Sequence, residues 1–137
     1  MNALEEIREV FERELSLKDI HFIGRTCMGR IEGNLRGKIE MGGMGIRISV
    51  LERTSGLVDE MKFLISDVTG RMLNDNRDYV WPKLDIEGDS SWWNCRMEEQ
   101  DYLKITDALN GYLDLFQSEV QIQEAEQDLG MSGNIIY

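Results

Sequence analysis

Apolar residues or glycines alternate with polar residues or glycine on both sides of the Gly42-Gly43 dipeptide, between residues 35 and 50. Alternation with a period of two predicts β-strands, and a Gly-Gly dipeptide between two such runs predicts a two-residue hairpin loop. Folding the chain there opposes Met41 with Met44, Ile39 with Ile46, Gly37 with Ile48 and Leu35 with Val50. A one-residue slip would destroy this agreement, so the pattern predicts a hairpin with one apolar face and one polar face.

The polar face of this hairpin is largely basic. Its members are Arg36, Lys38, Glu40, Arg47 and Ser49. Nucleic-acid-binding faces usually belong to basic domains and interleave aromatic residues with the charges, and neither feature is present here. We therefore expect no direct nucleic-acid binding. The basic side chains are expected to pair with acidic residues of the helices or with an acidic partner.

The remaining pattern predicts helices at both ends of the chain. Residues 3–15 and 98–116 carry apolar residues at helical spacing. Further strands are predicted at 17–31, 80–86 and 92–97, and Gly24 and Gly29 predict a bulge or sharp twist. Residues 57–68 fit both a helix and a strand, and the turn-like sequence after them favours the strand. The predicted fold is α+β: an antiparallel meander sheet of about five to six strands, flanked by an N-terminal and a C-terminal amphipathic helix.

Length and composition indicate a single domain. The chain has 137 residues, of which 42% are hydrophobic, and this is enough to bury a core. We predict an α+β domain over residues 1–116 and an acidic tail over 117–137, which either continues the helix or is disordered. No apolar run approaches the roughly 18 residues that a membrane span needs. The N-terminal stretch is acidic rather than signal-like, so a cytoplasmic location is expected.

The charge is unevenly distributed along the chain. The formal net charge is −11, yet residues 16–56 contain seven basic and four acidic side chains, a net +3. Residues 98–137 contain one basic and nine acidic side chains, a net −8. A basic central segment in an acidic protein influences which partners the protein meets and how fast, although it does not determine the fold.

Residues capable of catalysis or metal binding are few and scattered. His21 is the only histidine, and the two cysteines, Cys27 and Cys95, are far apart in the sequence. Residues 74–85 depart from a calcium loop, since Tyr79 stands where glycine is required and Asp85 where glutamate is required. We therefore predict no catalytic, cofactor or metal site, and a protein that is not an enzyme.

The preferred functional hypothesis is a non-catalytic acidic interaction protein. It would inhibit a bacterial nucleic-acid-handling enzyme, with carboxylates standing where nucleic-acid phosphates would bind. The predicted partner-binding residues are Glu98, Glu99, Asp101, Asp107 and Asp114. In size and composition alone, the chain resembles the small inhibitors that phages and mobile elements encode against restriction or CRISPR nucleases.

The alternative hypothesis is an α+β domain that binds a small molecule or acts as an enzyme. Its pocket would lie near Trp92, Trp93 and Tyr102, whose rings could form apolar walls. A third hypothesis is a subunit whose role is assembly, with a homodimer formed by the hairpin edge or the tail.

Overall fold

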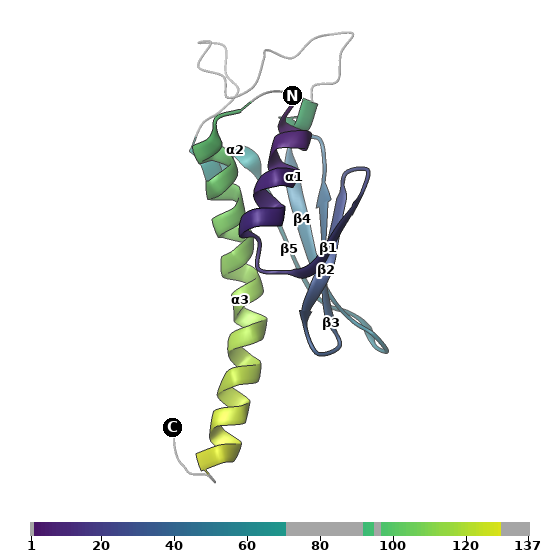
Figure 1. The fold of residues 1–137 in the computed structure, drawn as a ribbon, viewed down its shortest axis with the longest axis vertical. Helices are drawn as coiled ribbons and strands as arrows, with labels where there is room; N and C mark the ends of the chain where they lie inside the picture. Colours follow the sequence, from purple (N-terminus) through teal and green to yellow (C-terminus); the bar gives the residue numbers. More distant parts are fainter. Residues whose placement is uncertain (1, 71–91, 95–96, 130–137) are drawn as a thin grey trace.

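The computed structural model describes residues 2–70, 92–94 and 97–129, with residues 94 and 118–129 described by their backbone alone. Five strands form one antiparallel sheet in the order β1-β2-β3-β4-β5, so each strand pairs with its neighbours in the sequence. The elements are α1 (Ala3–Glu14), β1 (Lys18–Ile23), β2 (Thr26–Glu32), β3 (Leu35–Met41), β4 (Gly45–Glu52), β5 (Gly56–Leu64), α2 (Ile65–Thr69), the 3₁₀-helix η1 (Trp92–Asn94) and α3 (Glu99–Leu129). This arrangement confirms the predicted α+β meander sheet with a helix towards each end of the chain (Figure 1).

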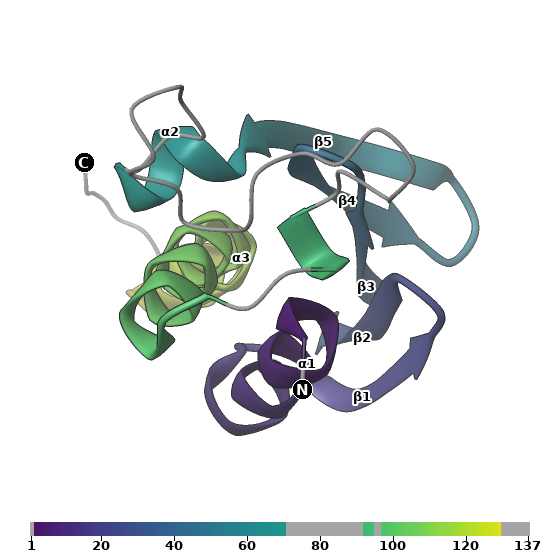
Figure 2. The same cartoon turned by 90° about the horizontal axis from the view of Figure 1, so that it is seen from above.

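The helices lie on one face of the sheet, and the sheet curves around them (Figure 2). The core forms where the apolar face of the strands meets the apolar sides of α1 and α3, with η1 between them. Its largest fully buried side chains are Trp92, Phe11, Ile7, Ile31, Ile39, Ile48, Ile65, Ile105, Leu109, Leu113 and Val50. We call the opposite face of the sheet the outer face. No helix of the described residues covers it (Figure 2).

The hairpin predicted around Gly42-Gly43 is formed by β3 and β4, and it has the predicted faces but a different register. Met41 lies opposite Ile46 and Ile39 lies opposite Ile48, two residues away from the predicted pairs. The turn is displaced by one residue along the chain, since the Gly42 N–H donates to the Gly45 carbonyl at 2.9 Å and leaves Gly43 and Met44 between them. A shift of two residues in register preserves side-chain parity, so both registers place the same side chains on each face.

The turn at Gly43 and Met44 makes backbone contacts beyond the hairpin in the observed register. The Met44 carbonyl accepts a hydrogen bond from the Ile65 N–H at 3.0 Å, and the Gly43 carbonyl accepts one from the Trp92 N–H at 3.1 Å. The backbone of the turn therefore accepts hydrogen bonds from segments that lie later in the sequence.

The single strand predicted over 17–31 is two strands joined by a turn. Ile23 pairs with Thr26, and Gly24 occupies the first loop position with a left-handed φ of 59°. Glycine takes this conformation without a Cβ clash, so the feature expected to be a bulge is a chain reversal. Phe22 pairs with Cys27, so core-facing positions change from even to odd across the turn, which a prediction of one continuous strand cannot accommodate.

Gly29 was also predicted to mark a bulge or sharp twist, and the structure has no bulge there. It pairs regularly with Gly37, and the register irregularity of β2 falls between Arg30 and Glu32. A Cβ on Gly29 would lie 2.9 Å from the Lys18 carbonyl oxygen and 2.9 Å from the Leu17 Cβ. The chain passes so close to Gly29 on its way from α1 to β1 that a side chain at this position would clash with it.

The ambiguous segment 57–68 contains both predicted structures in succession. β5 continues to Leu64 and α2 begins at Ile65, so the favoured strand is correct for the first part and the helical pattern for the second. The strand predicted over 92–97 is wrong at 92–94, which form η1 and bury Trp92 completely. The strand predicted over 80–86 lies outside the described residues. The C-terminal helix is confirmed, and it continues to Leu129.

Candidate functional site: an acidic groove between two helices

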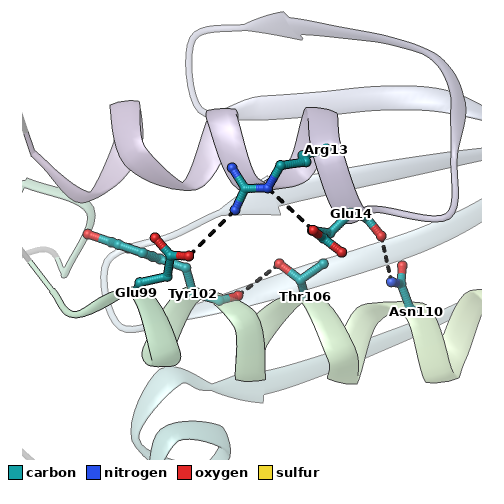
Figure 3. Close-up of polar contacts among 6 residues, drawn as sticks. All are labelled: Arg13, Glu14, Glu99, Tyr102, Thr106 and Asn110. Carbon is teal, nitrogen blue, oxygen red and sulfur yellow. Dashed lines mark hydrogen bonds and ion pairs between the residues drawn. The ribbon is translucent and has the colours of Figure 1, made fainter.

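The start of α3 lies beside α1, although about 90 residues separate them in the sequence. Asn2 caps α1 through a reciprocal capping box with Glu5, which fixes where the helix begins. Further along, the Asn110 Nδ2 donates to the Glu14 carbonyl at 2.9 Å, and the Asn110 Oδ1 accepts from the Ser16 N–H at 2.7 Å. Asn110 therefore holds the end of α1 against the middle of α3 (Figure 3).

A groove of about 430 Å³ lies between these two helices. Its lining residues are Glu6, Glu9, Val10, Arg13, Met97, Glu98, Glu99 and Tyr102. Four carboxylates thus converge with a single guanidinium. Arg13 crosses the gap, with its Nη2 at 3.8 Å from the Glu99 Oε2 (Figure 3). Both side chains of this ion pair are more than half exposed, so the pair contributes little to stability.

Tyr102 contributes an uncharged polar side chain to the groove lining. Its hydroxyl donates to the Glu6 carboxylate and accepts a hydrogen bond from the Met97 N–H at 3.0 Å. Burial raises the pKa of Tyr102 above its ordinary value, and the hydrogen bond to Glu6 raises the pKa further. The phenol therefore stays protonated at neutral pH, where it holds Glu6 in place.

The structure brings together only part of the acidic residue set predicted from the sequence. Glu98 and Glu99 line the groove, and both are exposed. Asp107 and Asp114 are exposed further along α3, and their seven-residue separation places them on one side of the helix. Asp101 is fully buried, and its Oδ2 accepts the Glu98 N–H at 3.2 Å. It therefore caps the start of α3 and is not available to a partner.

Sequence reasoning missed Glu6 and Glu9 as members of the site. Both occupy polar positions of the predicted N-terminal helix, where a carboxylate is most simply explained as solvent-exposed. Their proximity to Glu98 and Glu99 depends on how α1 and α3 pack. The usable signal was the acidic character of both helices in a chain whose residues 16–56 are net basic.

The predicted basic sheet face lies on the outer face, away from the groove. Strand register places Arg36, Lys38 and Arg47 there. Lys38 and Arg47 lie 3.8 and 4.0 Å from the Glu40 carboxylate. The expected pairing with the helices is therefore wrong for these two, because the helices pack on the other face of the sheet. A second groove, of about 750 Å³, crosses one end of the outer face and includes Arg47 and Lys62.

The other candidate residues occupy ordinary structural positions. His21 is exposed, with its Nδ1 3.4 Å from the Asp19 carbonyl oxygen. Cys27 is fully buried, and burial raises the pKa of its thiol to about 12, so it is a poor nucleophile. Within the described residues, no three His, Cys, Asp or Glu side chains cluster closely enough to hold a metal ion.

The rings proposed to surround a ligand belong mainly to the core. Trp92 is fully buried and Tyr102 is nearly so. Trp93 is half-buried, and the Arg25 guanidinium lies 4.8 Å from its ring centroid, at cation–π distance. A ligand pocket near Trp92, Trp93 and Tyr102 stays a prediction, and Trp93 is the ring best placed to contribute to it.

Comparisons with known proteins yield no relationship for this chain. No protein-family model matches it, and neither a curated protein nor a solved structure does so. Across the part of the chain that the structure describes, no helix combines the length and apolar character needed to cross a bilayer.

Proposed function

We propose that this protein is a non-catalytic interaction protein that binds a basic surface of a protein partner through the acidic groove. The observation that carries the proposal is the convergence of Glu6, Glu9, Glu98 and Glu99 on one groove between α1 and α3. Two separate acidic stretches of the sequence thereby form one negatively charged surface. Such a surface favours encounter with a positively charged partner and sets the orientation of docking.

The finer form of the proposal is inhibition by nucleic-acid mimicry. Carboxylates held on packed helices can occupy the sites of a basic groove that otherwise bind phosphates. Asp107 and Asp114 extend the negative surface along α3, on a helix fixed by burial of Ile105, Leu109 and Leu113. The basic outer face supports a directed mode of binding, because it would repel the same partner from the other side of the molecule.

The experiment is affinity capture from a bacterial lysate at low salt, followed by elution with duplex DNA or high salt. We expect a nucleic-acid-handling protein that both eluents displace, because exposed charges are screened over roughly 10 Å at 0.1 M salt. The test variant Glu9→Gln/Glu99→Gln removes two negative charges from the groove. The matched control Asp19→Asn/Asp67→Asn removes two exposed negative charges on β1 and α2, which do not belong to the acidic surface of α1 and α3.

The two variants distinguish a site from a general charge effect. Loss of capture by the groove variant with retention by the control supports the groove as the binding site. Equal weakening by both would show that net charge alone drives capture, which contradicts a defined site. A partner that duplex DNA fails to displace would contradict mimicry and leave the broader interaction role standing.

A further inference from the structure

From Asp59 to Leu64, strand β5 is a regular and exposed edge of the sheet, and its register irregularity against β4 lies at Val58. The opposite edge, β1, is interrupted, since its register with β2 is irregular between Lys18 and His21 and Asp19 has a left-handed φ of 55°. β5 has nine residues, and only Met61 and Phe63 are partly covered. Within the described residues, β4 is the one strand that pairs with it. Unpaired edges of this kind are templates for pairing with another strand.

Hydrogen bonds at the ends of the strands show which backbone groups of β5 point outward. The Gly42 N–H bonds to Gly45, so the Gly45 backbone faces β3 and the Met44 backbone faces β5. The Met44 carbonyl accepts the Ile65 N–H, so the Ile65 backbone faces β4. Because this direction alternates along a strand, odd-numbered residues of regular β5 bond to β4. The backbone groups of Glu60, Lys62 and Leu64 therefore point to the open edge.

The sequence of this edge is complementary to itself. If two copies of the chain pair antiparallel about a two-fold axis at Met61, Glu60 of each copy lies opposite Lys62 of the other. The axis thus creates two Glu60–Lys62 pairs. These two residues have outward-facing backbone groups, so each such pair would exchange both N–H to carbonyl bonds. At either end, Leu64 would approach Val58 of the second copy, which stands at the register irregularity of β5. Val58 is 47% exposed and Leu64 is 50% exposed, so both offer apolar surface.

We propose that a second copy of this chain pairs antiparallel with β5 about Met61 and joins the two sheets into one of ten strands. Glu60 and Lys62 lie on the outer face, as their register with Ser49 and Arg47 shows. Neither has an ion-pair partner among the described residues of its own copy. The two cross-strand ion pairs and the two apolar contacts would all form with the same edge of a second copy. The β5 edge of an identical chain is therefore the partner that this edge fits.

Neighbouring registers are disfavoured by charge. An axis at Glu60 would oppose Glu60 with itself, and an axis at Lys62 would oppose Lys62 with itself. Like charges directly opposite each other on paired strands are destabilising. Axes between residues would oppose an outward-facing backbone with an inward-facing one, which cannot form the ladder. The axis at Met61 therefore gives the complementary register within this central part of the strand.

The test is the molar mass of the full chain in solution, measured by light scattering or sedimentation over a concentration series. A monomer has a mass of 15.9 kDa, and we expect the wild type to approach twice this value as concentration rises. Glu60→Lys and Lys62→Glu each create two like-charge pairs across the axis. Each should weaken the dimer by tenfold or more, which corresponds to about 1.4 kcal/mol.

Mixing the two single variants provides a positive test. In the mixture, the lysine introduced at position 60 of one variant lies opposite the glutamate introduced at position 62 of the other, and the unchanged Lys62 lies opposite the unchanged Glu60. Both cross-strand pairs therefore become attractive again. We expect the mixture to form a heterodimer, and the double variant Glu60→Lys/Lys62→Glu to form a homodimer. Arg36→Glu is the control, because it reverses an outer-face charge on β3, an inner strand.

Two results would overturn the proposal. One is a wild-type mass that stays at the monomer value across the series. The other is a dimer that both single variants leave unchanged, which would assign it to a different surface. Circular dichroism of each variant separates a lost contact from a lost fold. The residues that line the acidic groove belong to α1 and to positions 97–102, and none of them belongs to β5, so partner capture and dimer formation can be measured independently.

Discussion

Two buried tyrosines each donate a hydrogen bond to a carboxylate, but in different surroundings. Tyr102 serves two groups, since it donates to Glu6 and accepts from the Met97 N–H. Tyr112 donates to the Asp59 Oδ2 at 2.7 Å and so connects α3 to the edge strand β5. Burial raises the pKa of both phenols, as does the adjacent carboxylate. The two residues therefore allow a comparison of how much each hydroxyl contributes to the free energy of unfolding.

We expect Tyr102→Phe to destabilise the fold more than Tyr112→Phe. Loss of the Tyr102 hydroxyl removes the acceptor of the buried Met97 N–H, and an unsatisfied buried group costs about 1–3 kcal/mol. Tyr112→Phe leaves an exposed carboxylate that water can solvate, so its cost is about 0.5–1.5 kcal/mol. Urea unfolding of the two variants measures the difference. Equal losses would show that the Met97 N–H does not depend on Tyr102.

At the scale of elements, the crossing from α1 to β1 depends on two glycines that face the core. Gly29 and Gly37 lie directly opposite each other in β2 and β3, and Leu17 packs over both. A Cβ on Gly29 would meet the Lys18 carbonyl oxygen, which is backbone. A Cβ on Gly37 would meet the Leu17 Cδ2 at 2.9 Å, which is the end of a flexible side chain.

We expect Gly29→Ala to be clearly more destabilising than Gly37→Ala. The backbone at Lys18 cannot move without disturbing β1, so overpacking there should cost about 1–3 kcal/mol. The Leu17 side chain can rotate away from position 37, and alanine regains about 0.5–1 kcal/mol over glycine in a strand. Thermal unfolding of both variants tests this order. The reverse order would show that Leu17, and not the Lys18 carbonyl, is the rigid contact.

At the scale of the whole molecule, α3 extends well beyond the sheet (Figure 1). Among the described side chains, the last one fully buried in the core is Leu113, and Phe116 is the last one packed against it. The first turns of α3 therefore complete the core and the acidic groove. This is consistent with the prediction that residues 1–116 form the folded domain, which a truncation can test.

A chain truncated after Gln117 should unfold at nearly the same urea concentration as the full chain. The truncation removes no side chain that the structure assigns to the core. We expect a change in unfolding free energy below about 1 kcal/mol, comparable to surface substitutions. The slope against urea should also stay the same, because it follows the surface exposed on unfolding. A large fall in the midpoint would place residues 118–137 within the cooperative unit.

The predicted function belongs to this same scale. The acidic groove and the basic outer face lie on different sides of one sheet, and both were visible in the sequence only as segments of opposite charge. Glu98 and Glu99 could be predicted as site members, since they begin a helix in the most acidic segment. The burial of Asp101 could not be predicted from the sequence, because it depends on the capping geometry at the start of α3. A cytoplasmic location and a nucleic-acid-handling partner stay predictions.

Local periodicity by itself determined much of this protein. The alternation around Gly42-Gly43 predicted a hairpin and which side chains face the core, since residues two apart in a strand share a face. Helical spacing likewise predicted α1 and the start of α3. These features depend on neighbours in the sequence, so the chain alone is sufficient to predict them.

Only the tertiary structure decided the register of the hairpin, the turn at Gly24 and the acidic groove. A two-residue shift leaves every side chain on the same face, and in the observed register the carbonyls of the turn accept hydrogen bonds from Ile65 and Trp92. The groove requires Glu6 and Glu98, more than 90 positions apart, to lie on helices that pack together. Contacts between distant segments leave no periodic trace in the sequence, because each is satisfied by a partner that the local pattern does not contain.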